Sequence, residues 1–430
     1  MKETLSIEKL DSLTVVCVAD FLRENIGKDV VIEFRDVLCC PHYVAPIFAL
    51  IDTYRMKGGD VELRVPSLSA IGRALSDGKD ECIFGKVCRF ASMDEYLDIF
   101  KSVQMAVLKL PNIGKGFKVA LGWCISEVMD NVIQHSGARC GYFMVQYVPS
   151  ERLLKTCVFD LGKGIRASLR GSKFSTESAE EAIRRAVEPN VTNGNGQGNG
   201  LYGLREIVKQ SSNGRLQITS AGAKYTLLEG AQQNETMERM NELPGFPGTT
   251  SVDFQVVLDD SLSIDSVFND AMPSMDLWLD DHELDESTFS LKVLEIVHGT
   301  ISREFGREIR HVVENLIDNE HKRVVVDFGG VDMCSSAFVD EFVGKLLVKY
   351  QFVNFSRMIR LQSLEGLPAL LINHSIKQRL SEEPLSAPEV KDSTGALNVG
   401  PTGPVPVLDA TNSEADDSME KKPTVVEAMP

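Results

Sequence analysis

The feature that most constrains this chain is a glycine-dense loop that runs directly into a helix-like segment. Residues 190–210 read NVTNGNGQGNGLYGLREIVKQ, and apolar residues recur at helical spacing from about Leu201 onward. Glycines let a backbone approach a ligand closely. The free N–H groups of such a loop, and of the helix N-terminus that follows it, can hold phosphate oxygens. The segment therefore predicts a phosphate-binding loop at the start of a helix.

An upstream segment places a carboxylate and an amide on one helix face. Glu127 and Asn131, in the segment GWCISEVMDNVIQH at 122–135, are one helical turn apart. An amide oxygen can bind Mg²⁺, and a carboxylate can activate a nucleophile. Taken alone, this spacing is more typical of a solvated helix face. The apolar spacing of the same segment predicts a single buried stripe, formed by Ile125, Val128, Met129, Val132 and Ile133.

Two further segments combine strand-like runs with small residues. In CVFDLGKGI, residues 157–165, an apolar run ends at Asp160 and is followed by Gly162 and Gly164. An aspartate at a strand end can accept a hydrogen bond from the exocyclic amine of a base, and the glycines would let that base lie against the backbone. An ordinary D-x-G-x-G turn is the alternative. Residues 248–254, GTTSVDF, form a strand start that carries hydroxyl groups.

Taken in order, these four segments resemble the GHKL ATPase superfamily, which includes DNA gyrase, histidine kinases and the anti-sigma factor kinases. The patterns that carry the resemblance are E-x-x-x-N, D-x-G-x-G, G-x-G-L-x-G-L and G-T-x, spread over roughly residues 95–260. A P-loop nucleotide site is excluded, because the chain contains no G-x-x-x-x-G-K-[ST] motif. The resemblance implies ATP and Mg²⁺ as cofactors.

The same resemblance implies a role for each matching position. Glu127 would be the general base and Asn131 the Mg²⁺ ligand, while Asp160 would read the adenine. Residues 170–197 would form a lid over the nucleotide. The remaining positions would surround the base and the phosphates: Gly162 and Gly164 beside the adenine, Gly198, Gly200, Leu201 and Gly203 in the phosphate loop, and Thr249 or Thr250 as the hydroxyl near the adenine pocket.

Two α/β patterns flank this central region and resemble each other. Residues 30–34 (VVIEF) and 324–328 (VVVDF) read as buried strands, and each is followed by a helical stretch and a second strand. The later pattern resembles STAS-like domains, with Ser335 at the turn where related domains carry a phosphorylated serine. Ser335 is therefore a possible phosphosite, and a simple helix cap is the alternative. The earlier pattern resembles the same fold more faintly, with Cys40 and Pro41 in place of the hydroxyl residues.

The expected fold class is α/β (α+β): a central GHKL two-layer sandwich with a mixed sheet, two small STAS-like flanking domains and a disordered tail. The tail is rich in Pro, Gly, Ser, Thr and acidic residues, which bury too little apolar surface to fold. The expected boundaries are a STAS-like module at 1–92, the ATP-binding domain at 93–258, an acidic linker at 259–286, a STAS-like domain at 287–385 and the tail at 386–430.

The charge and cysteine content narrow the partners and the compartment. A formal net charge of -17 disfavours nonspecific binding to nucleic acid, since phosphate backbones repel an acidic surface. The nine cysteines include no CxxC pair, which disfavours a zinc site or a disulfide framework. The longest apolar run is too short to span a bilayer. We expect a cytoplasmic protein without nucleic-acid or membrane partners.

The resulting functional expectation is an ATP-binding regulatory protein with ATPase or protein-serine kinase activity. Mg-ATP binding, with slow hydrolysis or transfer to serine, would switch contacts between the ATPase and the STAS-like modules. The alternative is a conformational ATPase or scaffold whose nucleotide state drives homodimerisation and recruits a protein partner.

Overall fold

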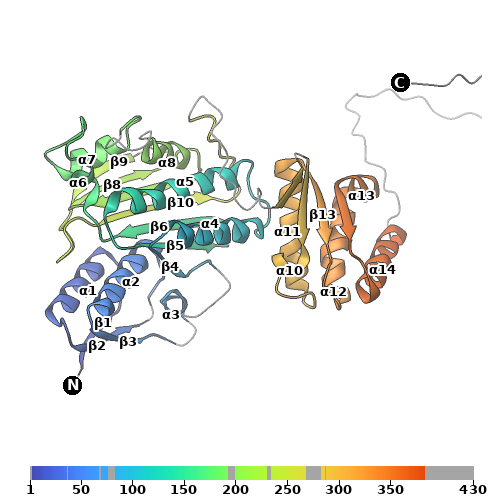
Figure 1. The fold of residues 1–430 in the computed structure, drawn as a ribbon, viewed down its shortest axis with the longest axis horizontal. Coiled ribbons are helices and arrows are strands. Elements are labelled where there is room, and N and C mark those ends of the chain that lie inside the picture. The colour runs from blue at the N-terminus through green and yellow to red at the C-terminus, as the bar shows by residue number, and fades with distance from the viewer. Residues whose placement is uncertain are drawn as a thin grey trace, which may run out of the picture. The chain divides into compact units, whose positions relative to one another are not determined.

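The computed structural model describes residues 2–35, 37–66, 69–75, 83–191, 199–229, 234–267, 282–285 and 287–382. Figure 1 shows these residues as helices packed on three separate sheets. The expected tail at 386–430 lies outside the described residues, as do Gly198 and most of the expected linker (268–281 and 286). None of the described helices combines the length and the apolar composition needed to cross a membrane.

The N-terminal residues form a parallel three-stranded sheet in the order β1-β2-β3. Val30, Val31 and Ile32 are at most 1% exposed, as expected for the centre of a parallel sheet covered by helices. Pro41 opens the helix that follows β2, where its missing N–H has no helical partner to lose. The elements are β1 (Glu3–Ile7), α1 (Ser12–Glu24), β2 (Asp29–Phe34), α2 (Pro41–Met56), β3 (Asp60–Arg64) and α3 (Ala70–Ala74).

The central sheet has seven strands in the order β4-β5-β6-β10-β7-β8-β9. Every named pair in it is antiparallel, so the expected mixed sheet is wrong. The reason is the place of β10: β6 and β7 run in the same direction, but β10 lies between them and pairs antiparallel with both. The strands are β4 (Val87–Phe90), β5 (Gly141–Val148), β6 (Leu153–Asp160), β7 (Arg215–Ser220), β8 (Ala223–Leu228), β9 (Asn234–Arg239) and β10 (Thr250–Val257).

Helices cover both faces of the strands that lead to the site. Along β5, Phe143 belongs to the apolar core shared with α4 (Met93–Leu108), α5 (Phe117–Asn131) and α8 (Gly200–Val208), whereas Tyr142 and Met144 belong to the core shared with α2. Side chains alternate across a strand, so both faces of β5 are buried. Two shorter helices, α6 (Gly164–Ser168) and α7 (Ala179–Ala186), lie between β6 and α8 in the chain. β4 pairs with β5 although it precedes residue 93, so we propose that the central unit begins before Val87.

The C-terminal residues repeat the N-terminal topology, with parallel strands in the order β12-β13-β14 and an antiparallel edge strand β11. β2 begins at Asp29 and β13 at Arg323, in line with the repeat seen in the sequence. The elements are β11 (Glu283–Asp285), β12 (Thr288–Lys292), α10 (Val293–Ile296), α11 (Arg303–Glu320), β13 (Arg323–Asp327), α12 (Ser336–Val339), the π-helical turn η2 (Asp340–Gly344), α13 (Lys345–Met358), β14 (Ile359–Gln362) and α14 (Gly366–Glu382).

Candidate functional site

Helix α5 presents Glu127 and Asn131 in its last turns. Ile125, Val128 and Met129 bury the opposite side of the helix, as the apolar spacing predicted. Glu127 is partly buried, and burial together with the nearby charge of Asp130 raises its pKa to about 6. Its carboxylate is therefore ionised at neutral pH but basic enough to take up a proton.

The helix continues beyond Asn131 as a π-helical turn, Val132–Ser136, and ends at Gly137 in the left-handed region with φ +67°. A π turn holds an extra residue, so the side chains that follow are rotated relative to the preceding stripe. Ile133 is 36% exposed, and its expected place in the buried stripe is wrong for this reason. The Ser136 carbonyl accepts a hydrogen bond from the Lys163 N–H at 2.9 Å, which joins the end of α5 to the turn after β6.

Asp160 ends strand β6 and is only 4% exposed. The Gly162 N–H donates to its Oδ1 at 2.8 Å. Burial raises the pKa of Asp160 to about 7, against the opposing effect of the Gly162 hydrogen bond. A Cβ at Gly162 would lie 2.5 Å from both Asp160 Oδ1 and the Ser136 carbonyl oxygen, so only glycine fits there. The carboxyl group is thus packed against bare backbone.

The next part of the turn approaches strand β10. Gly164 has φ +80°, and a Cβ there would lie 2.9 Å from the Gly248 carbonyl oxygen. The Ile165 N–H donates to Ser220 Oγ at 3.0 Å, and Ser220 Oγ lies 3.2 Å from Thr250 Oγ1. Thr250 is also the direct partner of Asp160 across β6 and β10.

The structure therefore brings Asp160, Gly162, Gly164 and Thr250 together. Thr249 contributes a carbonyl that accepts from the Ala221 N–H at 3.4 Å. Sequence reasoning did not assign Ser136, Ser220 or Gly248 to the site. Gly248 lies in the hydroxyl-bearing segment 248–254 and was open to detection, whereas nothing local marks the two serines.

Helix α8 begins over the carboxylate of Glu127. A Cβ at Gly200 would lie 2.4 Å from Glu127 Oε2, so a larger residue at the start of α8 would displace the Glu127 carboxylate. Leu201 is partly buried, and Gly203 is buried and donates its N–H to the Asn199 carbonyl at 2.8 Å. The first N–H groups of a helix have no intrahelical acceptors. The arrangement can hold an anion next to Glu127.

The described residues contain no group of three or more His, Cys, Asp and Glu side chains placed to hold a metal ion. Mg²⁺ differs from metals that need such a cage, because it is commonly held by one or two protein oxygens together with substrate phosphates. Glu127 and Asn131, one helical turn apart at the end of α5, offer two oxygen ligands of the kind that this pattern uses.

Comparison with known proteins identifies one part of the chain. Residues 306–366 match the family model of a STAS-like domain of unknown function (DUF4325). No curated protein sequence matches the chain. Two of the solved structures that it is similar to are the topoisomerase IV ATP-binding domain of Francisella tularensis with a small-molecule inhibitor and the 43K ATPase domain of Thermus thermophilus gyrase B with an aminocoumarin.

The first of these matches has 13% sequence identity and a TM-score of 0.22, and it covers 38% of this chain and 40% of the solved one. The second has 15% identity and a TM-score of 0.19, and it covers 35% and 36%. The chain thus spans about two fifths of the solved chains it matches. The C-terminal STAS-like expectation is confirmed by the family model.

We predict that Asp160→Asn changes how stability depends on pH. The folded carboxyl keeps its proton up to about pH 7, whereas an unfolded one loses it near pH 4. The folded state thus binds more protons between these values, so the free energy of unfolding of the wild type falls as pH rises. Asparagine cannot ionise. The free energy of unfolding of the variant minus that of the wild type should therefore rise by on the order of 1 kcal/mol per pH unit.

Denaturant unfolding of both proteins between pH 4.5 and 8 measures this difference, in which the contributions of other titrating groups cancel. Parallel stability curves for the two proteins would show that Asp160 is not held protonated by its surroundings.

Proposed function

We propose that the central unit binds ATP with Mg²⁺ and uses the nucleotide state to change contacts with the C-terminal STAS-like domain. The observation that carries the proposal is the burial of Asp160 at a strand end surrounded by glycine backbone. A base amine placed there would donate to the carboxylate, and the bare backbone at Gly162 and Gly164 would accommodate a flat ring. Thr250, the direct partner of Asp160 across β6 and β10, supplies a hydroxyl at the same end of the two strands.

The phosphates would lie at the N-terminus of α8, which begins above Glu127. Asn131 would ligate Mg²⁺ through its amide oxygen, and the metal would neutralise phosphate charge. Glu127, with its pKa near 6, would take a proton from the attacking nucleophile. Gly198, outside the described residues, belongs to the same proposed phosphate loop.

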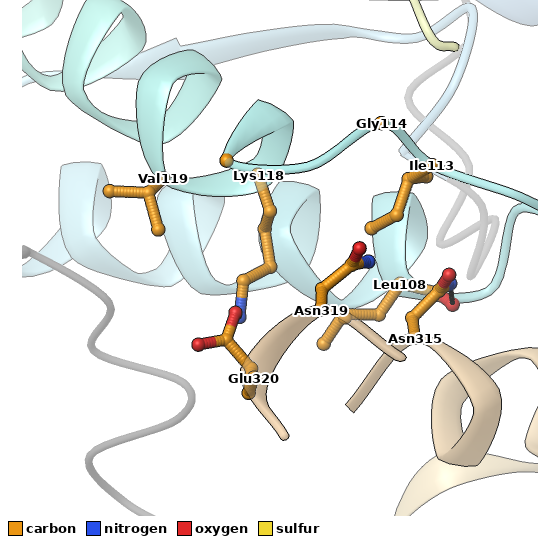
Figure 2. A pocket seen from close by; sticks show the side chains of 9 residues that line it. Leu108, Ile113, Gly114, Lys118, Val119, Asn315, Asn319 and Glu320 are labelled. Carbon is orange, nitrogen blue, oxygen red and sulfur yellow. Dashed lines mark hydrogen bonds and ion pairs between the residues drawn. The ribbon is translucent and has the colours of Figure 1, made fainter. Parts of the chain in front are cut away.

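Two helices of the central unit, α4 and α5, also contact the C-terminal domain. Asn315 of α11 donates from Nδ2 to the carbonyls of Leu108 and Leu110 at 2.8 and 2.9 Å, and so caps the end of α4. On α5, Lys118 Nζ lies 3.8 Å from Glu320 Oε1, and Figure 2 shows the two side chains facing each other. A pocket at this contact is lined by Leu108, Ile113, Gly114, Gly116, Lys118, Val119, Asn315, Asn319 and Glu320.

Since α5 carries Lys118 near its start and Glu127 and Asn131 near its end, it could transmit nucleotide binding to α11. We expect a saturating non-hydrolysable ATP analogue to change amide hydrogen exchange in residues 303–320. At an analogue concentration that just saturates the wild type, the change should be much smaller in Asp160→Ala, the control with weakened nucleotide affinity. Unchanged exchange in a wild-type sample that calorimetry shows to be saturated would contradict the coupling.

Hydrolysis is favoured over transfer to Ser335 by the contacts of that side chain. Ser335 Oγ donates to the Ile301 carbonyl at 2.6 Å and accepts from the Phe338 N–H at 3.0 Å, as the N-cap of α12. Phosphorylation would remove the donor and disrupt the cap. We therefore place slow ATP hydrolysis first and phosphotransfer to Ser335 second. Mass spectrometry after incubation with Mg-ATP separates the two, since only the second leaves phosphate on the protein.

For nucleotide binding we predict that Asp160→Ala weakens ATP affinity by about 10- to 100-fold, the equivalent of a lost hydrogen bond to a charged acceptor. Isothermal titration calorimetry measures the affinity. Glu151→Ala, an exposed carboxylate in the turn between β5 and β6, is the control and should bind as wild type. Equal affinities for all three proteins would remove Asp160 from the site.

Glu127→Gln should separate binding from chemistry. The amide keeps the size of the side chain but cannot accept the proton, so phosphate release should fall by roughly 100-fold or more while ATP binding persists. Steady-state phosphate release together with calorimetry on the same samples measures both quantities. Turnover equal to that of wild type would exclude Glu127 as the general base.

A further inference from the structure

Four cations surround one buried carboxylate in the C-terminal domain. Glu341 lies in the π-helical turn η2 and is 1% exposed. Its carboxylate oxygens lie 2.8 Å from Lys345 Nζ, 3.1 Å from Arg310 Nη2, 3.4 Å from Arg303 Nη1 and 3.7 Å from Arg307 Nε. Burial raises the pKa of Glu341, but hydrogen bonds from Lys345 and Arg310 outweigh it and hold the pKa below its usual value. The carboxylate is therefore charged.

The close backbone contact between α11 and the segment α12–η2 explains why the cations meet at Glu341. A Cβ at Gly306 of α11 would lie 2.6 Å from the Phe338 carbonyl oxygen and 3.2 Å from Glu341 Cβ, so the helices touch at this point. Arg303, Arg307 and Arg310 lie on the face of α11 next to the contact. This face differs from the one that uses Asn315 to cap α4. The arginines consequently meet above Glu341.

The charges in this cluster do not balance. Arg310 also binds Glu314 through both carboxylate oxygens, at 3.0 and 3.1 Å, so these two charges offset each other. Within the part of the chain that the structure describes, Arg303, Arg307 and Lys345 share Glu341 as their carboxylate partner, and their side chains are 54%, 53% and 47% exposed. The two arginine contacts are long, and a guanidinium carries five N–H donors. An excess of about two positive charges faces solvent on a chain whose net charge is -17.

We propose that Arg303, Arg307 and Lys345 form a binding site for a phosphate monoester on a phosphorylated protein segment. A phosphate monoester carries a charge of about -1.5 to -2 at neutral pH, which matches the local excess. Its oxygens accept paired donors from guanidinium groups. Val348 follows Lys345 by about one helical turn on α13 and is 47% exposed. Its side chain would contact an apolar residue beside the phosphorylated one, which favours a peptide over free phosphate.

Calorimetry on the full chain tests the site with two synthetic peptides that differ only in carrying phosphoserine or serine, followed by an apolar residue. We expect the phosphopeptide to bind at least about tenfold more tightly than the serine peptide. In the double variant Arg303→Ala/Arg307→Ala, the affinity for the phosphopeptide should fall by at least about tenfold. Arg303→Lys/Arg307→Lys, which keeps the positive charges around Glu341, should fold normally and bind with intermediate affinity.

Arg357→Ala/Arg360→Ala is the matched control, because it removes the same charge from exposed positions of the same domain. It should keep wild-type affinity. Asp160→Ala should also keep it, which separates this site from the proposed nucleotide site. Three results would each overturn the proposal. The two peptides could bind with equal affinity, or Arg303→Ala/Arg307→Ala and Arg357→Ala/Arg360→Ala could lose equal affinity for the phosphopeptide. The third is free inorganic phosphate binding as tightly as the phosphopeptide.

Discussion

The candidate site depends on the packing of the Asp160 carboxyl against backbone that carries no side chains. Gly162 approaches both Asp160 and the Ser136 carbonyl, and Gly164 approaches Gly248, so α5, β6 and β10 meet within contact distance around one acidic group. The Gly162 N–H donates to this carboxyl group, but burial outweighs that hydrogen bond and disfavours the charged form, so the pKa is raised to about 7. Strongly shifted groups of this kind are concentrated at functional sites. A hydrogen bond donated by a ligand to Asp160 would offset the unfavourable free energy of ionising the buried carboxyl group.

Local patterns were sufficient to predict the elements that carry the site. The expected helix with Glu127 is α5, the apolar run before Asp160 is β6, and the helix after the glycine-dense loop is α8, which begins at Gly200. Each prediction rested on signals within about one element: apolar spacing, a polar residue at the end of an apolar run, or clustered glycines. The flanking β-α-β patterns were visible for the same reason, and their shared strand order agrees with the repeat in the sequence.

The features that could not be predicted from the sequence depend on contacts between distant segments. The insertion of β10 between β6 and β7 makes the sheet antiparallel, and no local pattern encodes that strand order. The π turn that begins at Val132 leaves Ile133 at the surface and is followed by the contact of the Ser136 carbonyl with the Lys163 N–H. Ser220 enters the site through its pairing with Thr250 and through the hydrogen bond that it accepts from the Ile165 N–H. The cations around Glu341 likewise converge only because α11 and α12 touch at Gly306.

The most direct test of the central claim is a crystal structure of the full chain with Mg²⁺ and a non-hydrolysable ATP analogue. The account predicts the exocyclic amine of the adenine within hydrogen-bond distance of the Asp160 carboxylate, about 2.7–3.2 Å. It also predicts the phosphates at the N-terminus of α8 and the metal bound by the amide oxygen of Asn131. A nucleotide bound elsewhere, or one whose base lies away from Asp160, would contradict the account.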